Sequence, residues 1–167
     1  MLQIGVIGDS LPSMEGKRLA FEVGKEIADA GYAVICGGLG GVMEEACRGA
    51  KSVGGITVGI LPGIDSGAAN PYVDIVVATG VGEARNVLVV KSCLAVIAIE
   101  GGYGTLSEIA FALKAGIRVI GLNTWEMSSG TPTDYADEII RVSNAREAVD
   151  KALQGSKNSE YRSQNSE

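Results

Sequence analysis

Two glycine-rich turns carry the clearest chemical signal in this sequence. The stretch "EGGYGTLSEIAFALKAG" (100–116) places three glycines within five positions and then continues into an apolar, alanine-rich segment. The stretch "CGGLGGVMEEA" (36–46) has the same arrangement. Where such a turn opens a helix, its free N–H groups and the helix dipole can bind an anion. A tight connection without a ligand explains one glycine pair easily, but two such clusters poorly.

Ten residues of these turns and of the neighbouring strand end are expected to contact a bound anion. Ser10 follows a strand near 2–8, where it fits a ligand contact and the N-cap of the next helix equally well, as does Asp9. The other nine belong to the two glycine turns. The expected ligand-binding residues are Ser10, Gly37, Gly38, Gly40, Gly41, Gly101, Gly102, Tyr103, Gly104 and Thr105.

Two charged residues could act on a ligand held there. Arg85 lies in the first turn of an expected helix, where a cation opposes the helix dipole by about 0.3–1 kcal/mol. An anion should compensate it, either Glu83, Glu108 or a ligand. Glu108 lies three residues after Thr105, so "TLSE" is a capping box or the source of a catalytic carboxylate, and the residues alone leave both alternatives open.

Several classes of chemistry are excluded or unsupported. The sequence has no histidine, which excludes His-based zinc sites and Ser-His-Asp triads. Neither glycine cluster is followed by the Lys-Ser/Thr of an ATP-binding P-loop, and "GYGTLS" only weakly resembles a dinucleotide fingerprint. A net charge of −6 without any run of Lys or Arg argues against nucleic-acid binding. We expect a small phosphorylated ligand, and neither a metal nor a cofactor of the protein's own.

Length and hydropathy predict one soluble domain. A chain of 167 residues with 46% hydrophobic residues can bury one substantial core. Apolar runs such as "LAVIAI" are too short to cross a bilayer, and "MLQIGVIGDS" lacks the charged start of a signal peptide, so we expect a cytoplasmic protein without membrane contact. The widely spaced Cys36, Cys47 and Cys93 are expected to be buried free thiols.

Short β-branched runs alternate with helical patterns, which predicts an α/β fold. We expect a Rossmann-like, doubly wound parallel sheet of about seven strands, in the order 3-2-1-4-5-6-7, with helices on both faces and a ligand site between strands 1 and 4. We expect residues 1–153 to form this single nucleotide-binding domain and 154–167 to form a disordered tail. The helix near 83–92 is apolar on more than one face, which predicts a homodimer or a larger homo-oligomer. The expected strands are near 2–8, 32–36, 56–61, 73–78, 94–99, 117–122 and 138–142, and the expected helices cover about 19–30, 42–53, 83–92, 105–115 and 144–153.

The segments "GGLGGVMEEACRGAKSVGGITVGILPG", "GEARN" and "EGGYGTLSEIAFALKAG" together resemble the Lonely Guy family, long labelled "possible lysine decarboxylases", over residues 2–153. The resemblance implies a doubly wound fold, a dimer and hydrolysis of nucleoside 5′-monophosphates to base and ribose 5-phosphate. It implies catalytic roles for Arg85 and Glu108, and phosphate binding by the glycines of "EGGYGT".

Departures from that family's motifs favour a second function. Glu100 replaces a proline, and "GEARN" has Gly82 and Asn86 where the family has Met and Lys. A Glu100 carboxylate about 6 Å from a phosphate would cost about 2.8 kcal/mol at an effective dielectric of about 20. The same variant resembles molybdenum-cofactor carrier proteins, which bind an anionic pterin phosphate. Hydrolysis, which the resemblance to the Lonely Guy family implies, is the first hypothesis, a non-catalytic carrier or sensor is the alternative, and a dimeric scaffold is the third.

Overall fold

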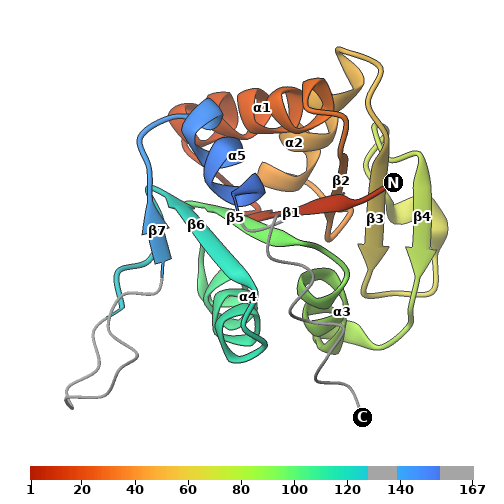
Figure 1. The fold of residues 1–167 in the computed structure, drawn as a ribbon. Coiled ribbons are helices and arrows are strands. Elements are labelled where there is room, and N and C mark those ends of the chain that lie inside the picture. The colour runs from red at the N-terminus through yellow and green to blue at the C-terminus, as the bar shows by residue number, and fades with distance from the viewer. Residues whose placement is uncertain (128–138, 155–167) are drawn as a thin grey trace, which may run out of the picture.

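The computed structural model describes residues 1–127 and 139–154, in which strands alternate with helices (Figure 1). All pairings between neighbouring strands are parallel. The strands are β1 (Gln3–Gly8), β2 (Ala33–Cys36), β3 (Thr57–Leu61), β4 (Ile75–Ala78), β5 (Ala95–Ile99), β6 (Arg118–Leu122) and β7 (Ile139–Arg141). The helices are α1 (Met14–Asp29), α2 (Val42–Lys51), α3 (Arg85–Lys91), α4 (Tyr103–Lys114) and α5 (Ala145–Leu153), with short 3₁₀ turns η1 (Ser66–Ala68) and η2 (Gly82–Ala84).

Helices cover both faces of the sheet: α1, α2 and α5 pack on one face, and α3 and α4 on the other (Figure 1). Successive side chains of β5 alternate between the layers, since Ala95, Ile97 and Ile99 pack with the first group of helices and Val96 and Ala98 with the second. Strands buried on both faces must be apolar at every position. The expected α/β, Rossmann-like, doubly wound fold of seven strands is therefore confirmed.

The predicted strand order was wrong in one respect. The sheet runs β4-β3-β2-β1-β5-β6-β7, so β4 lies at the edge beside β3, and β1 pairs with β5. The connection from β3 to β4 contains only η1, and no long helix carries the chain across the sheet. Ile75 and Val77 consequently remain 51% and 43% exposed. The point at which the strand order reverses lies between β1 and β5, not between strands 1 and 4.

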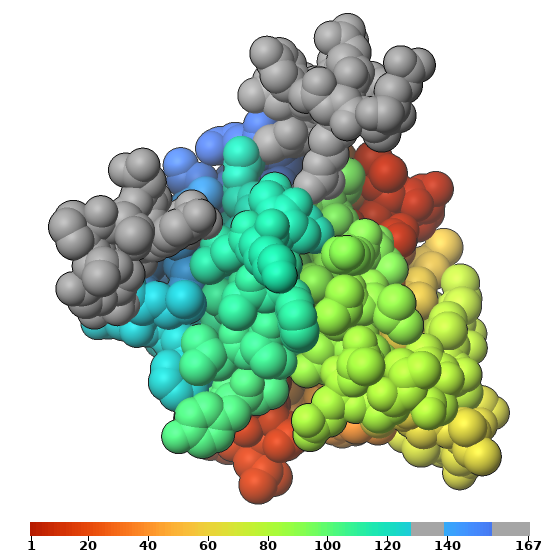
Figure 2. All heavy atoms as spheres, turned by 90° about the horizontal axis from the view of Figure 1, so that it is seen from below, coloured from red at the N-terminus to blue at the C-terminus, as the bar shows by residue number. Residues whose placement is uncertain are grey.

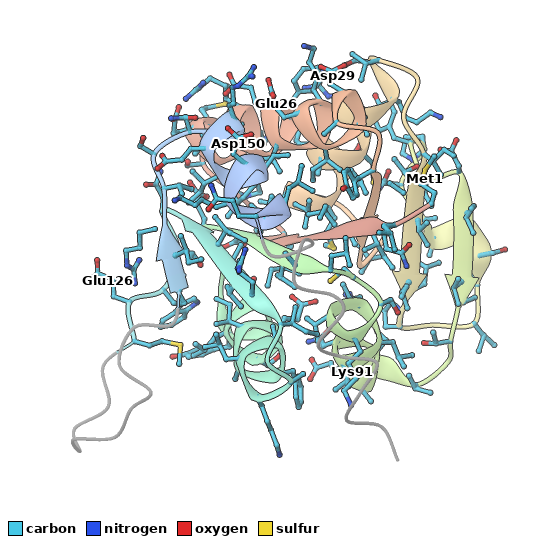
Figure 3. The ribbon with its side chains drawn as sticks, in the orientation of Figure 1. Met1, Glu26, Asp29, Lys91, Glu126 and Asp150 are labelled. Carbon is cyan, nitrogen blue, oxygen red and sulfur yellow. The ribbon has the colours of Figure 1, made fainter. Side chains whose placement is uncertain are left out.

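Charged side chains mark the outer surfaces of the two helix layers. In Figure 3, Glu26 and Asp29 project from α1 and Asp150 from α5, away from the sheet, and Lys91 lies on α3 in the opposite layer. The apolar faces of these helices are therefore free to pack on the sheet. None of the helices within residues 1–127 and 139–154 has the length and hydropathy needed to cross a bilayer. From residue 155 on, the expected tail lies outside the described residues.

The three cysteines are free and buried, as predicted. Cys36, at the end of β2, lies with its Sγ 3.6 Å from the Sγ of Cys47 in α2. The hydrogen bond with Cys36 and burial raise the pKa of the Cys47 thiol. Together with Met43 these thiols form a small apolar cluster under the turn that joins β2 to α2.

Candidate functional site

A cleft of about 820 Å³ opens at the carboxyl ends of β1, β2 and β5, where ligands bind in doubly wound sheets. Both glycine turns reach it, as does the start of α3. Eight of the twelve predicted site residues line it: Ser10, Gly37, Arg85, Gly102, Tyr103, Gly104, Thr105 and Glu108. The other four predicted residues, Gly38, Gly40, Gly41 and Gly101, do not line it.

At three of these four positions, the backbone conformation or close packing requires glycine instead. Gly38 and Gly41 have φ values of 75° and 72°, which only glycine adopts easily. A Cβ at Gly41 would also lie 2.4 Å from the carbonyl oxygen of Asp9, so the turn before α2 packs directly on the end of β1. Gly101 has a φ of 116°, and its Cβ would meet Thr105 at 2.5 Å. These glycines shape the turns rather than the cleft surface.

Gly37 positions the main cation of the cleft. A Cβ at Gly37 would lie 2.0 Å from Nη1 of Arg85, so the guanidinium lies directly against the Gly37 backbone. Arg85 is the first residue of α3, and η2 before it brings the chain back from the sheet edge. Arg85 therefore meets Gly37 and the start of α4 at the cleft as predicted, whereas the first N–H group of α2 is not free for a ligand, because the Val42 N–H donates to the carbonyl oxygen of Asp9.

Arg85 is largely buried and incompletely paired. Its side chain is 11% exposed, and Nη1 lies 3.7 Å from Oε1 of Glu108. Nε and Nη1 have no hydrogen-bond partner among the described residues. A buried charged donor without an acceptor costs about 1–3 kcal/mol or more. An anion that accepted these hydrogen bonds would remove that cost.

Glu108 is a buried carboxyl group and not part of a capping box. The residue lies inside α4, which begins at Tyr103 rather than near 105, with Gly102 as its N-cap. The capping-box alternative is therefore wrong: Thr105 lies within the helix and packs against Gly101. Burial raises the pKa of Glu108 to about 7, although the neighbouring Arg85 lowers it. Near neutral pH this group can both donate and accept a proton.

The start of α4 presents backbone donors to the cleft. The N–H groups of Tyr103, Gly104 and Thr105 are the first of the helix and have no acceptor within it, and no side chain among the described residues caps them. A Cβ at Gly102 or Gly104 would meet nothing within 4 Å, and neither residue has a positive φ. Because the fold itself does not require glycine at these two positions, open space there suits an approaching ligand.

Sequence reasoning missed one polar link between the walls of the cleft. The side-chain amide of Asn86 donates to Oγ of Ser107 at 3.0 Å, and that hydroxyl donates to the carbonyl oxygen of Gly104 at 2.7 Å. From the sequence, Asn86 shows only the loss of a lysine. Its position directly after Arg85 was the one available signal, since no sequence spacing relates it to Ser107. Within residues 1–127 and 139–154, no group of three His, Cys, Asp or Glu residues could hold a metal ion.

Glu100 does not face the cleft, which corrects the expected repulsion of a phosphate. Its Oε2 accepts a hydrogen bond from the Ser13 backbone N–H at 2.9 Å, and its Oε1 accepts one from the Ser13 hydroxyl. Ser13 is the N-cap of α1, where it accepts a hydrogen bond from the N–H of Gly16, so neither Asp9 nor Ser10 has that role. The Glu100 carboxylate thus lies at the positive end of the α1 dipole.

Comparisons with known proteins bear on the family and the fold of this chain. A model of the SLOG cluster4 family matches residues 1–149. An uncharacterised protein of Archaeoglobus fulgidus is 52% identical over 122 residues, which cover 73% of this chain and 80% of that protein.

Two similar structures are of proteins that are described as binding or carrying molybdenum cofactor. The molybdenum cofactor binding protein of Rippkaea orientalis superposes with a TM-score of 0.81 and 32% identity over 92% of this chain and 96% of that one. The molybdenum cofactor carrier protein of Chlamydomonas reinhardtii superposes with a TM-score of 0.79 and 32% identity over 92% and 99%.

Proposed function

Because this chain belongs to the SLOG cluster4 family, we propose that its cleft binds a small phosphorylated heterocycle and that the protein carries this molecule. Molybdenum cofactor, a pterin phosphate, is the first candidate, since two similar structures are of proteins described as binding or carrying it. This was the alternative hypothesis from the sequence, and it now has more support than hydrolysis.

One juxtaposition carries the proposal: the incompletely paired guanidinium of Arg85 and the free N–H groups of α4 line the same cleft. A phosphate there would accept charge-assisted hydrogen bonds from Arg85 and would lie at the positive end of a helix dipole. Gly102 and Gly104 would let its oxygens approach the backbone closely. The ligand would then be held by its phosphate, with the rest of the cleft left for its ring.

Binding can be tested by titrating the protein with a phosphorylated pterin by calorimetry and by native mass spectrometry of the purified protein. We expect Arg85→Gln to weaken binding at least about ten-fold, because charge-assisted hydrogen bonds are lost. Arg18→Gln is the matched control, since Arg18 pairs with Glu15 and Glu22 on the outer surface of α1. Equal affinity of the Arg85 variant and wild type would overturn the proposal.

A second variant tests whether the phosphate lies against the start of α4, and it does so without removing a charge. Gly104→Ala should stabilise α4 by about 0.5–1 kcal/mol, since glycine is a poor helix residue. The added methyl group would project into space that the phosphate needs, so we expect weaker binding in a more stable protein. Higher stability with unchanged affinity would show that the phosphate does not lie against Gly104.

Hydrolysis of a nucleoside monophosphate remains a second candidate because Glu108 has a pKa of about 7 and lines the cleft. In that reaction water adds to C1′ of the ribose, the bond from C1′ to the base breaks, and the base leaves with a proton. Glu108 would orient the water and stabilise the positive charge on the ribose. Incubation with AMP and an assay for ribose 5-phosphate tests it: product that disappears in Glu108→Gln supports hydrolysis, and no product from wild type excludes it for AMP.

A further inference from the structure

Two aromatic side chains border the cleft beside the start of α4. Tyr103 lines the cleft, and 84% of its surface is exposed. Its ring centroid lies 5.9 Å from that of Trp125, with the ring planes tilted by 33°. This is the range of an offset aromatic contact. Trp125 thus contacts the Tyr103 ring while most of that ring remains open.

Trp125 is fixed in place by several contacts. Its Nε1 donates to the carbonyl oxygen of Gly102 at 3.1 Å, and its own carbonyl oxygen accepts from Nη2 of Arg141 at 3.0 Å. The indole also packs against the core cluster between the sheet and the α3–α4 layer. Because its neighbour is held by these contacts, the Tyr103 ring has a preferred position before any ligand binds. Such preorganisation lowers the entropy cost of binding.

The segment after β6 that contains Trp125 also orients the turn before α4. The hydroxyl of Thr124 donates to the carbonyl oxygen of Glu100 at 2.6 Å, and the Trp125 indole occupies that of Gly102. Two carbonyl groups of the turn therefore accept hydrogen bonds from the segment after β6, and that of Gly102 also accepts one from the Leu106 N–H of α4. Tyr103 follows directly and places its ring next to those donors.

Packing alone does not account for Tyr103, because a ring that is 84% exposed buries little apolar area. We propose that Tyr103, backed by Trp125, is the stacking surface for the flat nitrogen heterocycle of the ligand. This inference rests on the proposed function, in which the phosphate lies at Gly102–Thr105. Pterins and purines share the required chemistry, since both present a π face to an aromatic side chain. A cleft of about 820 Å³ has room for a phosphate and a bicyclic ring.

The test compares probes with and without a ring: neopterin monophosphate, AMP and ribose 5-phosphate, each titrated by calorimetric competition. We expect Tyr103→Ala to weaken binding of a ring-bearing probe about ten-fold and to leave that of ribose 5-phosphate unchanged. Tyr103→Phe is the matched control, because it keeps the ring and should retain wild-type affinity. Loss with neopterin monophosphate alone identifies a pterin, and loss with AMP alone identifies a purine.

Trp125 gives an independent readout because it is the only tryptophan in the sequence. Bound neopterin monophosphate absorbs where tryptophan emits, so it should quench this fluorescence in wild type and in Tyr103→Phe. If wild type binds none of the three probes, the proposed function fails together with this inference. If wild type binds the ring-bearing probes and Tyr103→Ala binds them equally well, the stacking surface is wrong and the phosphate site stands.

Discussion

At the scale of single residues, Arg85 and Glu108 form a buried pair whose charges do not fully compensate their loss of water. The two side chains are 11% and 9% exposed, and their nearest charged atoms are 3.7 Å apart, too far for a hydrogen bond. Burial of both charges costs free energy that such a loose pair only partly recovers. Arg85 therefore retains donors for another anion, and Glu108 ionises only near neutral pH.

The ionisation of Glu108 makes stability depend on pH. Burial raises its pKa from 4.5 to about 7, against the opposing effect of Arg85. Between these values the folded chain binds more protons than the unfolded chain, so the free energy of unfolding falls as pH rises. We expect the unfolding free energy of wild type, relative to Glu108→Gln, to fall by about 2 to 3 kcal/mol from pH 5 to pH 8.

Urea denaturation of both proteins at pH 5, 6, 7 and 8 measures this difference. Taking the difference between two proteins removes the contributions of all other carboxyl groups, which both share. A difference that stays constant over this range would contradict the raised pKa of Glu108.

Gly37 offers a way to move Arg85 without changing its charge. In Gly37→Ala the new Cβ would occupy the place of Nη1, and the guanidinium must shift. We expect about ten-fold weaker binding of a phosphorylated pterin, measured by calorimetry, with little change in stability because a flexible side-chain end can move. Gly40→Ala is the matched control from the same turn, since its Cβ would meet only Oε2 of Glu44, at 3.7 Å. Equal loss in both variants would show that the position of Arg85 is not the cause.

At the scale of elements, Glu100 joins the end of β5 to the start of α1. Its backbone has a φ of 52°, which is unfavourable for a residue with a Cβ. Hydrogen bonds from Ser13 to its carboxylate and from the Thr124 hydroxyl to its carbonyl oxygen hold this conformation. A Cβ at Gly16 would lie 2.6 Å from the carboxylate, so this glycine makes room for it. The positive end of the α1 dipole is thus compensated by a carboxylate group of the same chain.

We expect Glu100→Gln to lower the free energy of unfolding by about 1 kcal/mol, because a charge is lost at the α1 N-terminus. We expect its affinity for a phosphorylated pterin to stay within about two-fold of wild type, since the carboxylate does not line the cleft. Chemical denaturation and calorimetry measure the two effects. Up to about a hundred-fold tighter binding in the variant would instead support the repulsion expected from the sequence.

Most elements could be predicted because hydrophobic periodicity and glycine positions are local signals. Most strands and helices lie close to their expected ranges, although α1 begins at Met14 rather than near residue 19, and the glycine turns follow β2 and β5 as expected. The start of α4 was missed because Gly102 and Gly104 are weak helix residues, and only tertiary contacts extend the helix through them. The direction of the Glu100 side chain depends on Ser13, 87 positions away, and no local pattern encodes that contact.

At the scale of the whole molecule, α3 and α4 lie side by side on one exposed face (Figure 2). Leu88 of α3 is 43% exposed and Phe111 of α4 is 40% exposed. Apolar side chains on two adjacent helices suit an interface with a second copy of the chain. The predicted homodimer therefore stays a prediction, now with a defined surface.

Light scattering coupled to size exclusion tests this surface. We expect wild type to have twice the 17.2 kDa mass of the chain. Leu88→Lys should weaken the dimer at least about ten-fold, since burying a leucine contributes about 1.5–3 kcal/mol. Ile64→Lys is the matched control, because Ile64 is 87% exposed and lies in the loop after β3. A monomeric wild type would refute the expectation.

The topology shows where sequence reasoning reaches its limit. The right-handed crossover rule fixes the hand of each connection, but it does not fix how many strands a connection crosses. Both the expected order 3-2-1-4-5-6-7 and the observed order are compatible with that rule. Nevertheless, all glycine turns were placed on the correct edge of the sheet, because carboxyl ends of parallel strands share one edge. The location of the cleft was therefore predictable even though the strand order was not.

The pairing of β1 with β5 has a consequence for biosynthesis. On one side β1 pairs with β2, but on the other side Ile7 pairs with Ala98, so this second pairing forms only after β5 has been synthesised. The cleft also needs α4, whose Gly104 and Glu108 follow β5. A nascent chain that ends before β5 has an open edge at β1 and no complete pocket. The cleft can therefore form only after the residues through α4 have been synthesised.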